Sequence, residues 1–347
     1  MNKDKIEKIL KIYNINGLVS SVKQLQSFAN EVYFVNVSNL SFILKKHLVS
    51  NKKDLLERLT IIQELKNNGI NIPSILVNSK NEYITAFGDG IYELDEYIDH
   101  KSLNYPEYNI TLQELTQAGI ELAKIHNTSK LQAFLKSIDF TNINNKVVKL
   151  IDEFDTLYES DASINEKTQR KAEVIYKFLE NTKEGRNELL KNSLLYNVSN
   201  SDYVLIHGDY SLTNLLPSKK DGKLYITDWD GMKYAPRMFE VQRAIGLLCS
   251  NGKCNANLDE YNVDRVKAFL SGYKQNYTFT SRDIDILGAV ANYCFYIYWL
   301  EFSLSQTING DYRILDIFPN KLEDAMFWKT NVEKYITFLK SEVIMDV

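Results

Sequence analysis

The spacing of apolar residues changes near residue 98, from a mixed strand and helix pattern to a mainly helical one. At the N-terminus we expect an amphipathic helix, because Ile6, Ile9 and Leu10 recur at helical intervals among charged residues. Residues 31–37 and 41–45 are β-like runs joined by a tight link, which is typical of a hairpin. The chain is therefore expected to begin with a helix and two paired strands.

A second helix and a second hairpin follow in the pattern. Residues 54–68 carry leucine and isoleucine at helical spacing and are followed by a glycine. Residues 70–77 form a further β-like run. The runs 82–87 and 91–98 flank a Gly-Asp-Gly turn, which predicts two antiparallel strands.

Beyond residue 103 the apolar spacing is mostly that of helices. Residues 112–126 are one amphipathic helix, and 142–195 and 237–342 contain further helical segments. Two short strands interrupt this region at 203–206 and 224–227, with an Asp-Gly turn shortly before the second. We expect a hairpin set among helices at this point.

This pattern predicts an α+β fold with two domains, a small β-rich one over residues 1–98 and a larger, mainly helical one over 99–347. The length of 347 residues agrees with domains of roughly 100–200 residues. Lys+Arg 41 and Asp+Glu 45 give a formal net charge of -4, so no strongly basic surface is implied. Nucleic acid is therefore not an expected partner.

The cysteines, the apolar segments and the N-terminus indicate in which cellular compartment the protein is expected. Cys249, Cys254 and Cys294 form no CxxC pair or Cys/His cluster, which argues against a disulfide framework and a structural zinc site. The apolar stretch 288–304 contains Asn292 and a glutamate and is shorter than the ~20 residues of a spanning helix. The charged N-terminus does not resemble a signal peptide. We expect a cytoplasmic protein without a membrane partner.

Two neighbouring segments carry the residues expected of a catalytic site. Asp209 and Asn214 lie five residues apart in the loop that follows the strand 203–206, and Asp228 follows the strand 224–227. Phosphoryl transfer requires an aspartate to accept the hydroxyl proton, and an asparagine and a second aspartate to hold Mg²⁺ against the phosphates. The spacing fits that chemistry.

The order HxDxxxxN followed by Asp228 resembles the aminoglycoside phosphotransferase and choline kinase superfamily, small-molecule relatives of the protein kinases. The resemblance runs in order along most of the chain. It implies a bilobal protein-kinase-like fold with ATP in the cleft between the lobes, and ATP and Mg²⁺ as cofactors. In this scheme Asp209 is the catalytic base, Asn214 has a catalytic role as well, and Asn214 and Asp228 hold the metal.

The resemblance also implies nucleotide-binding residues in the first hundred positions. The segment 27–33 looks like the loop that covers the nucleotide, which assigns Ser27 and Asn30 to it. Lys45 corresponds to the lysine that contacts the ATP phosphates. Glu57 is the preferred partner of this lysine from the following helix, with Glu64 as the second choice.

Adenine is expected to bind the strand after the second hairpin turn, through backbone groups near Glu96 and Ile98. The chain departs from the family pattern at Ser27 and Ala29, where glycines are common. It departs again at Glu240, where an aspartate often braces the catalytic loop.

Two histidines and one aspartate admit more than one role. His207 is favoured as a structural brace of the loop, although its side chain can also act as a general base. His126 is expected to pack inward at a helix end. Asp230 is either a second metal ligand, a substrate ligand or a solvent-exposed loop residue.

The acceptor molecule leaves the weakest signal. The aromatic helix 283–304 is either a core helix or part of the acceptor pocket, through Tyr296, Trp299 and Glu301. Aromatic faces beside an acidic group suit a cationic acceptor by cation–π contact. Aminoglycosides, choline-like alcohols and homoserine-like amino acids all fit this description.

The sequence thus predicts a phosphotransferase that moves the γ-phosphate of ATP to a hydroxyl of a small molecule. A non-catalytic assembly protein is the alternative, because the chain also resembles a spore-coat branch of the family. Intact Lys45, Asp209, Asn214 and Asp228 argue against a pure scaffold. A protein kinase is disfavoured, because no activation-loop-like stretch precedes Glu240. Nothing in the sequence indicates an oligomeric state.

Overall fold

The computed structural model describes residues 1–25, 30–48, 52–103, 109–128, 135, 137–138, 140, 143–160, 166–191, 198, 202–250, 263–308 and 318–344. These residues form two compact units. The first unit contains described residues of 1–103 together with 213–231, and the second contains those of 104–129, 134–212 and 232–347. The units therefore divide the chain differently from the boundary proposed at residue 98, because the segment 213–231 belongs to the first.

The first unit is built on a five-stranded antiparallel sheet with the strand order β1-β2-β3-β5-β4. Its strands are β1 (Val19–Leu25), β2 (Asn30–Val37), β3 (Leu40–His47), β4 (Ile84–Phe87) and β5 (Gly90–Glu96). Both predicted hairpins are confirmed, because β2 pairs with β3 and β4 pairs with β5. In each hairpin the turn is short, so neighbouring strands in the sequence pair locally.

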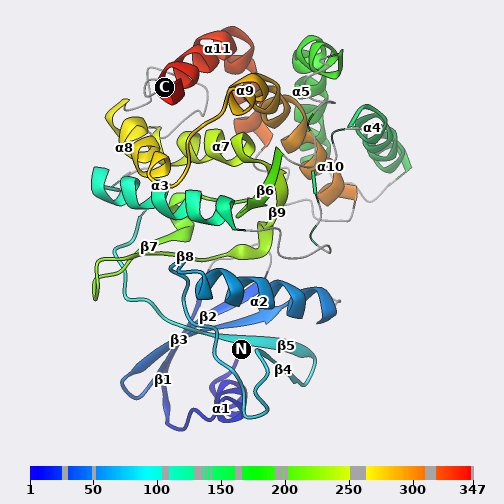
Figure 1. Ribbon diagram of the computed structural model, residues 1–347. Helices are drawn as coiled ribbons and strands as arrows, with labels where there is room; N and C mark the ends of the chain where they lie inside the picture. Colours follow the sequence, from blue (N-terminus) through cyan, green and yellow to red (C-terminus); the bar gives the residue numbers. More distant parts are fainter. Residues whose placement is uncertain are drawn as a thin grey trace. The chain divides into compact units, whose positions relative to one another are not determined.

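Two helices lie on opposite sides of this sheet, α1 (Lys3–Ile12) and α2 (Lys52–Asn67) (Figure 1). The helix α1 packs its buried face against one face of the sheet, in a core that includes Tyr33, Leu44 and Leu94. Because side chains alternate along a strand, Lys45, Glu93 and other neighbours of these core residues point to the opposite face. The sheet thus has one apolar face and one that carries charged groups.

One predicted strand of this unit is wrong. Residues 70–77 form no strand apart from a single bridge between Ile75 and Asp95. The segment instead follows the edge of β5 through two further backbone hydrogen bonds, from Leu76 N–H to the Leu94 carbonyl and from Glu96 N–H to the Ser74 carbonyl. Ile70 and Ile72 are buried without a regular ladder, whereas Val77 is exposed. Apolar spacing alone does not distinguish such a segment from a strand.

The pairing of the two later strands also differs from the prediction. The strand β8 (Leu224–Ile226) pairs with β7 (Leu215–Pro217), within the first unit. In the second unit, β6 (Tyr203–Ile206) pairs with β9 (Lys233–Pro236). The predicted runs do form strands, but each pairs with a short strand that the sequence pattern did not reveal.

The remainder of the second unit is helical, as expected. Its helices are α3 (Leu112–Asn127), α4 (Ile143–Ser160), α5 (Glu166–Lys191), α7 (Arg237–Cys249), α8 (Val263–Lys274), α9 (Ser281–Tyr293), α10 (Trp299–Ile308) and α11 (Phe318–Ile344). A π-helical turn, Cys294–Tyr298, joins α9 to α10, so the aromatic helix is continuous but locally underwound. Among the helices in the described residues, none is long and apolar enough to cross a membrane.

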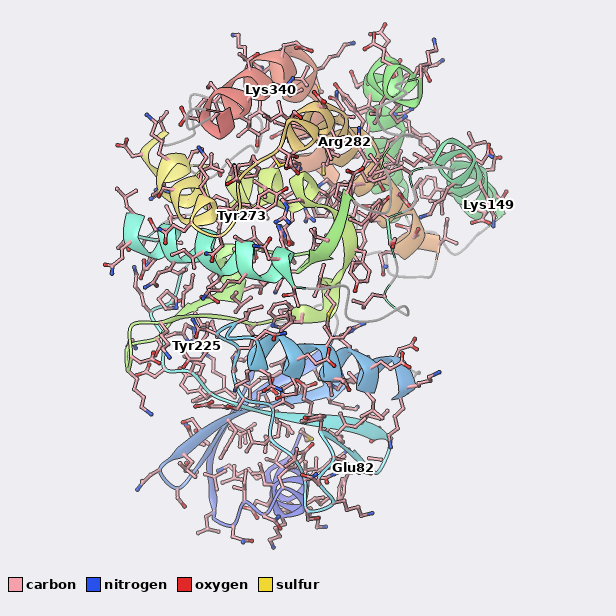
Figure 2. All side chains as sticks on the ribbon, in the orientation of Figure 1. Glu82, Lys149, Tyr225, Tyr273, Arg282 and Lys340 are labelled. Carbon is pink, nitrogen blue, oxygen red and sulfur yellow. The ribbon has the colours of Figure 1, made fainter. Side chains whose placement is uncertain are left out.

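The helices α3 and α8 approach each other closely at two glycines. A Cβ atom on Gly119 would overlap the carbonyl oxygen of Phe269, and one on Gly272 would overlap that of Thr116. Neither position has room for a side chain. The close contact matters for the site, because His126 lies in the last turn of α3 and α8 carries Tyr273, labelled in Figure 2.

Candidate active site

The loop that carries Asp209 begins where β6 ends, in the second unit. The backbone N–H groups of His207 and Gly208 both donate to the carboxylate of Glu240, at 2.8 and 2.5 Å. Gly208 has a φ of 88°, a left-handed conformation that glycine adopts without strain. Glu240, on α7, therefore braces the loop, as the resemblance implies for this position.

The carboxylate of Glu240 is itself held by a buried network. The His126 Nε2 atom lies 3.0 Å from Glu240 Oε2, and His126 Nδ1 lies 2.7 Å from the hydroxyl of Tyr273. Arg237 donates to that hydroxyl at 2.8 Å. Burial lowers the pKa of His126, which favours a neutral ring that donates from Nε2.

Burial opposes the charge on Glu240, but the hydrogen bonds from His126 and the Gly208 N–H, together with the influence of the neighbouring His207, outweigh it and lower the pKa of this glutamate. Glu240 therefore remains a carboxylate that can accept both backbone N–H groups. His126 packs inward at the end of α3, which agrees with its expected place.

Asp209 is exposed, whereas the residues before it are buried. Its backbone N–H donates to His207 Nδ1 at 3.2 Å, so this ring nitrogen acts as an acceptor. His207 is completely buried and thus has the bracing role that the sequence favoured. Arg243 donates to the Gly208 carbonyl at 3.0 Å, so both backbone groups of this glycine are held.

Asn214 and Asp228 are brought together by the β7–β8 hairpin of the first unit. Asn214 ends a 3₁₀ turn directly before β7, and its carbonyl accepts a hydrogen bond of 3.0 Å from the N–H of Thr227, which follows β8. Asp228 comes next and is exposed, with a φ of 63°. Such a left-handed backbone is uncommon outside glycine and occurs at functional sites.

The donor atoms at this end of the hairpin fit Mg²⁺. An asparagine amide oxygen and a carboxylate are hard oxygen ligands, and Mg²⁺ in phosphoryl-transfer sites uses one or two carboxylates together with phosphates and water. No group of three or more His, Cys, Asp or Glu that could hold a metal is found among the described residues. An amide oxygen and one carboxylate fill only part of the coordination shell of Mg²⁺, so a cation here would need further oxygen ligands from phosphate or water.

Asp230 lies in the 3₁₀ turn that follows Asp228, and it is bound by two side chains of the same unit. Asn30, at the start of β2, donates to Asp230 Oδ2 at 2.7 Å, and Arg58, on α2, donates to Oδ1 at 2.7 Å. Both carboxylate oxygens are therefore engaged. The geometry favours a role that was not among the three considered for Asp230, a link between this turn, β2 and α2.

Lys45 has partners that the sequence did not predict. Its Nζ atom lies 2.9 Å from Glu93 Oε1 and 2.7 Å from Asp95 Oδ2, both on β5. Glu57, the expected partner, is half-buried and lies 3.7 Å from Lys53, one turn earlier on the same helix. The expected Lys45–Glu57 pair is thus absent from the structure, because the strand neighbours of the lysine already supply two carboxylates.

The pKa values of the two carboxylates on β5 are shifted in opposite directions. Burial and the nearby charge of Glu93 raise the pKa of Asp95. Burial also opposes the charge on Glu93, but Lys45 and His47 outweigh it and lower its pKa. His47 Nε2 lies 2.9 Å from Glu93 Oε2, while Asp95 Oδ1 is buried with no hydrogen-bond partner.

The expected adenine-binding segment is partly engaged by its own unit. The Glu96 N–H donates to the Ser74 carbonyl, and the Glu96 carboxylate accepts from the Ser74 hydroxyl at 2.8 Å. The carbonyl of Ile98 lies 2.7 Å from His100 Nδ1. Ser27, assigned to the nucleotide-covering loop, lies outside the described residues.

The predicted acceptor residues have partners within the second unit. Tyr296 is buried in the π-helical turn and packs so closely on Gly185 of α5 that a Cβ there would lie 2.6 Å from its ring. Glu301 accepts from the Tyr293 hydroxyl at 3.0 Å and forms an ion pair with Lys146. For Tyr296 and Glu301 the core interpretation of this helix fits better than the acceptor pocket.

The aromatic faces nearby lie against the protein's own cations. The Arg243 guanidinium lies 5.0 Å from the ring centroid of Tyr298 and 5.7 Å from that of Trp299. Lys233 Nζ lies 4.9 Å from the Tyr298 centroid. These rings therefore already have cation–π partners, which removes the reason for expecting a cationic acceptor at them.

Sequence reasoning missed the carboxylates Glu93 and Asp95 and the cations Arg58 and Arg243. A signal for the first pair exists, since β5 places two acids two positions apart on one strand face. That these acids lie beside Lys45 becomes known only from the register between β3 and β5.

Comparison with protein families and solved structures finds matches over most of the chain. A model of the phosphotransferase enzyme family matches residues 21–279. No curated protein matches the chain. Among solved structures, a spectinomycin phosphotransferase in complex with ADP and spectinomycin has a TM-score of 0.69 at 18% identity, covering 99% of each chain.

Two further solved structures show the same fold. A microcompartment-associated aminopropanol kinase has a TM-score of 0.61 at 15% identity, covering 95% of this chain and 98% of its own. A choline kinase from Cryptosporidium parvum Iowa II has a TM-score of 0.57 at 13% identity, covering 92% of each chain. At these identities the likeness establishes a protein-kinase-like fold, in agreement with the α+β architecture expected from the sequence.

Proposed function

The chain belongs to the phosphotransferase enzyme family, and from this membership we propose that it transfers the γ-phosphate of ATP to a hydroxyl of a small molecule. The observation that supports the proposal most strongly is the β7–β8 hairpin. It places Asn214 and Asp228 at one of its ends, joined by the hydrogen bond from Thr227 to the Asn214 carbonyl. A scaffold protein has no need for an asparagine and an aspartate at this end of a hairpin.

Asp209 is the proposed catalytic base. Its carboxylate is exposed, while the backbone before it is fixed by Glu240 and Arg243. A base held in this way orients the acceptor hydroxyl and takes its proton as the oxygen attacks the γ-phosphorus. The bond to the β-phosphate oxygen breaks, and ADP leaves.

Asn214 and Asp228 are the proposed metal-binding residues, and Asn214 thereby also serves the chemistry. Their oxygens would hold Mg²⁺, which in such sites neutralises charge on the phosphates. Asp230 is excluded from this set, because Asn30 and Arg58 already bind both of its oxygens.

Lys45 is proposed to bind the ATP phosphates from β3. The Ile98 N–H is proposed to bind adenine, because the Glu96 N–H and the Ile98 carbonyl have partners within the unit. Ser27 and Asn30 keep their proposed place in the nucleotide-covering segment, with the Asn30 side chain anchoring that segment to Asp230. ATP and Mg²⁺ are thus the proposed cofactors, and a cytoplasmic location is proposed with them.

The proposed acceptor is a small molecule defined by its hydroxyl and not by its charge. Aminoglycoside-, choline- and homoserine-like compounds remain candidates. The rings of Tyr298 and Trp299 lie against Arg243, so they give no support to a cationic acceptor in particular.

The test is ADP release from Mg·ATP across a panel of spectinomycin and other aminoglycosides, choline, aminopropanol, homoserine and sugars. The product is identified by its phosphorus NMR signal. We expect turnover with one class of acceptor, and loss of turnover in Asp209→Ala with Mg·ATP binding retained. Normal turnover in Asp209→Ala would show that the base is misassigned. A wild-type chain that Mg·ATP does not stabilise against thermal unfolding would favour the assembly protein instead.

A further inference from the structure

Lys45 and Glu93 are direct neighbours across the β3–β5 ladder. Their side chains lie on the same face of the sheet, 2.9 Å apart between Nζ and Oε1. Asp95 stands opposite Ile43, two positions from Lys45, and reaches the same ammonium diagonally at 2.7 Å. All three groups are therefore held by one strand register.

The three side chains differ in exposure, and the cation is the most exposed of them, as binding of a phosphate from solvent requires. The side chains of Glu93 and Asp95 are 3% and 8% exposed, whereas that of Lys45 is 22% exposed. The lysine is thus the member of the cluster that reaches solvent. His47 contacts the second oxygen of Glu93 at 2.9 Å, so this carboxylate is held from two sides.

The charged residues Glu57 and Arg58 of α2 do not contact Lys45 but have other partners. Its Glu57 lies near Lys53 of the same helix, at 3.7 Å. Its Arg58 reaches Asp230, two residues after the proposed metal ligand Asp228. Arg58 of α2 therefore reaches the turn after β8, whereas the contacts of Lys45 run to β5.

We propose that Glu93, supported by Asp95 and His47, is the positioning residue of Lys45, and that strand β5 takes the part expected of a helix glutamate. The inference rests on the proposed function, because that function assigns Lys45 to the ATP phosphates. It assigns a new role to Glu93: to hold the ammonium at one place on the sheet while nucleotide enters and ADP leaves. Glu93 acts through Lys45 and does not itself touch the nucleotide.

The pair is tested first by thermal unfolding without nucleotide. The variants are Lys45→Met, Glu93→Gln and the double variant, with Glu57→Gln alone and combined with Lys45→Met. Lys45→Met leaves the buried Glu93 carboxylate without its lysine, and Glu93→Gln leaves Lys45 with Asp95 as its remaining carboxylate on β5, so each single variant should lower the melting temperature. The double variant should lose less than the sum of the two, because neither charge is left alone. The Glu57→Gln effect should add to that of Lys45→Met.

The role is tested by ADP release from Mg·ATP with the acceptor found in the panel, or with water where none is found. We expect Glu93→Gln to lower kcat at least tenfold with KM for ATP within about threefold, since positioning is used in the transition state. In the Lys45→Met background the same substitution should have no further effect. Asp89→Asn, which removes an exposed partner of Lys5, is the matched control and should keep wild-type turnover.

Three results would overturn the inference. Additive melting temperatures for Lys45→Met and Glu93→Gln would show that the pair is not coupled. A tenfold loss of kcat with Glu57→Gln, and no such loss with Glu93→Gln, would show that the helix glutamate positions Lys45. A wild-type chain with coupled melting temperatures but no ADP release would overturn the proposed function, and with it the role of the pair, while leaving the pair itself established.

Discussion

The carboxylate of Glu240 accepts a hydrogen bond from the backbone N–H of Gly208 at 2.5 Å, one residue before Asp209. Its other oxygen accepts from the His207 N–H at 2.8 Å and contacts His126 at 3.0 Å. One buried side chain on α7 thus fixes two successive backbone groups of the loop that carries Asp209, the proposed base. The accuracy with which Asp209 is placed depends on this carboxylate.

Substitution of Glu240 by Gln should therefore impair both folding and turnover. The amide keeps one acceptor and turns an NH₂ group toward the backbone donors, so at least one buried N–H loses its partner. Hydrogen bonds to a charged group contribute about 1.5–3 kcal/mol each, and we expect a loss of about 3 kcal/mol in the free energy of unfolding. Urea unfolding and steady-state kinetics measure the two effects.

A matched pair of variants separates loop bracing from general damage. Glu240→Asp keeps the charge but shortens the reach, so it should retain more turnover than Glu240→Gln. Leu248 lies on the same helix and is equally buried, and Leu248→Ala should cost about 2–5 kcal/mol by leaving a cavity. Equal kcat per folded molecule in Glu240→Gln and Leu248→Ala would contradict the bracing role.

Asp230 is predicted to be a structural link and not a metal ligand. Asp230→Asn weakens the contact with Arg58, whose side chain and that of Asp230 are 27% and 34% exposed. Such a part-exposed pair contributes no more than about 1 kcal/mol, so the melting temperature should fall by only a few degrees. The concentration of Mg²⁺ needed for half-maximal turnover should change less than twofold.

Asp228→Asn serves as the control for that prediction, because it removes the carboxylate proposed to hold the metal. It should raise the Mg²⁺ requirement at least tenfold. If Asp230→Asn raises the requirement as strongly as Asp228→Asn, Asp230 is a metal ligand after all.

The sequence predicts this molecule best where contacts are local. Both hairpins of the first unit are joined by short turns, and α1 and α2 follow from apolar spacing alone. The strand β6 was found as a strand, yet its partner β9 begins 27 residues after it ends, and nothing in the alternation of either strand identifies the other. Register between distant strands is set by packing, which a single sequence does not display.

In the candidate site, too, residues with local spacing were predicted and partners distant in the sequence were not. Asp209, Asn214 and Asp228 are recognisable because their spacing is fixed within short loops. The partner of Lys45 was assigned to Glu57 because a helix follows β3, but Glu93 on the paired strand lies closer. Asp230 was left with several roles because its partners, Asn30 and Arg58, come from elements 200 and 172 residues away.

The buried Asp95 should make stability depend on pH. Burial and the charge of Glu93 raise its pKa from 3.8 to about 8. Between these values the folded chain binds a proton that the unfolded chain has released, so stability falls as pH rises. One group of this kind contributes a slope of up to about 1.4 kcal/mol per pH unit. Lys45 and Glu93 are the nearest charged groups that face Asp95, and Lys66 on α2 also acts on it electrostatically.

Urea unfolding of wild type and Asp95→Asn at pH 5, 6, 7 and 8 measures that slope. The asparagine does not titrate, so wild type should lose stability relative to Asp95→Asn at each step toward pH 8. The comparison cancels the titration of groups common to both chains. Parallel curves for the two proteins across this range would show that Asp95 is ionised in the folded state.

The glycines between α3 and α8 give the last prediction. Gly119→Ala places a methyl group against the carbonyl oxygen of Phe269, a backbone atom that cannot turn aside. Overpacking of this kind costs about 1–3 kcal/mol, which exceeds the gain of about 1 kcal/mol from replacing a helical glycine by alanine. Separation of the helices would also stretch the 2.7 Å contact between His126 and Tyr273, which supports Glu240.

Gly288→Ala is the matched control, because Gly288 is also helical but its added methyl would lie 3.3 Å from Ile336 Cδ1, the end of a flexible side chain. We expect Gly288→Ala to be neutral or stabilising by up to about 1 kcal/mol. Gly119→Ala should lower the free energy of unfolding by about 2 kcal/mol and also lower kcat per folded molecule. If Gly119→Ala matches Gly288→Ala in both measurements, α3 and α8 do not make the close contact on which the bracing of the Asp209 loop depends.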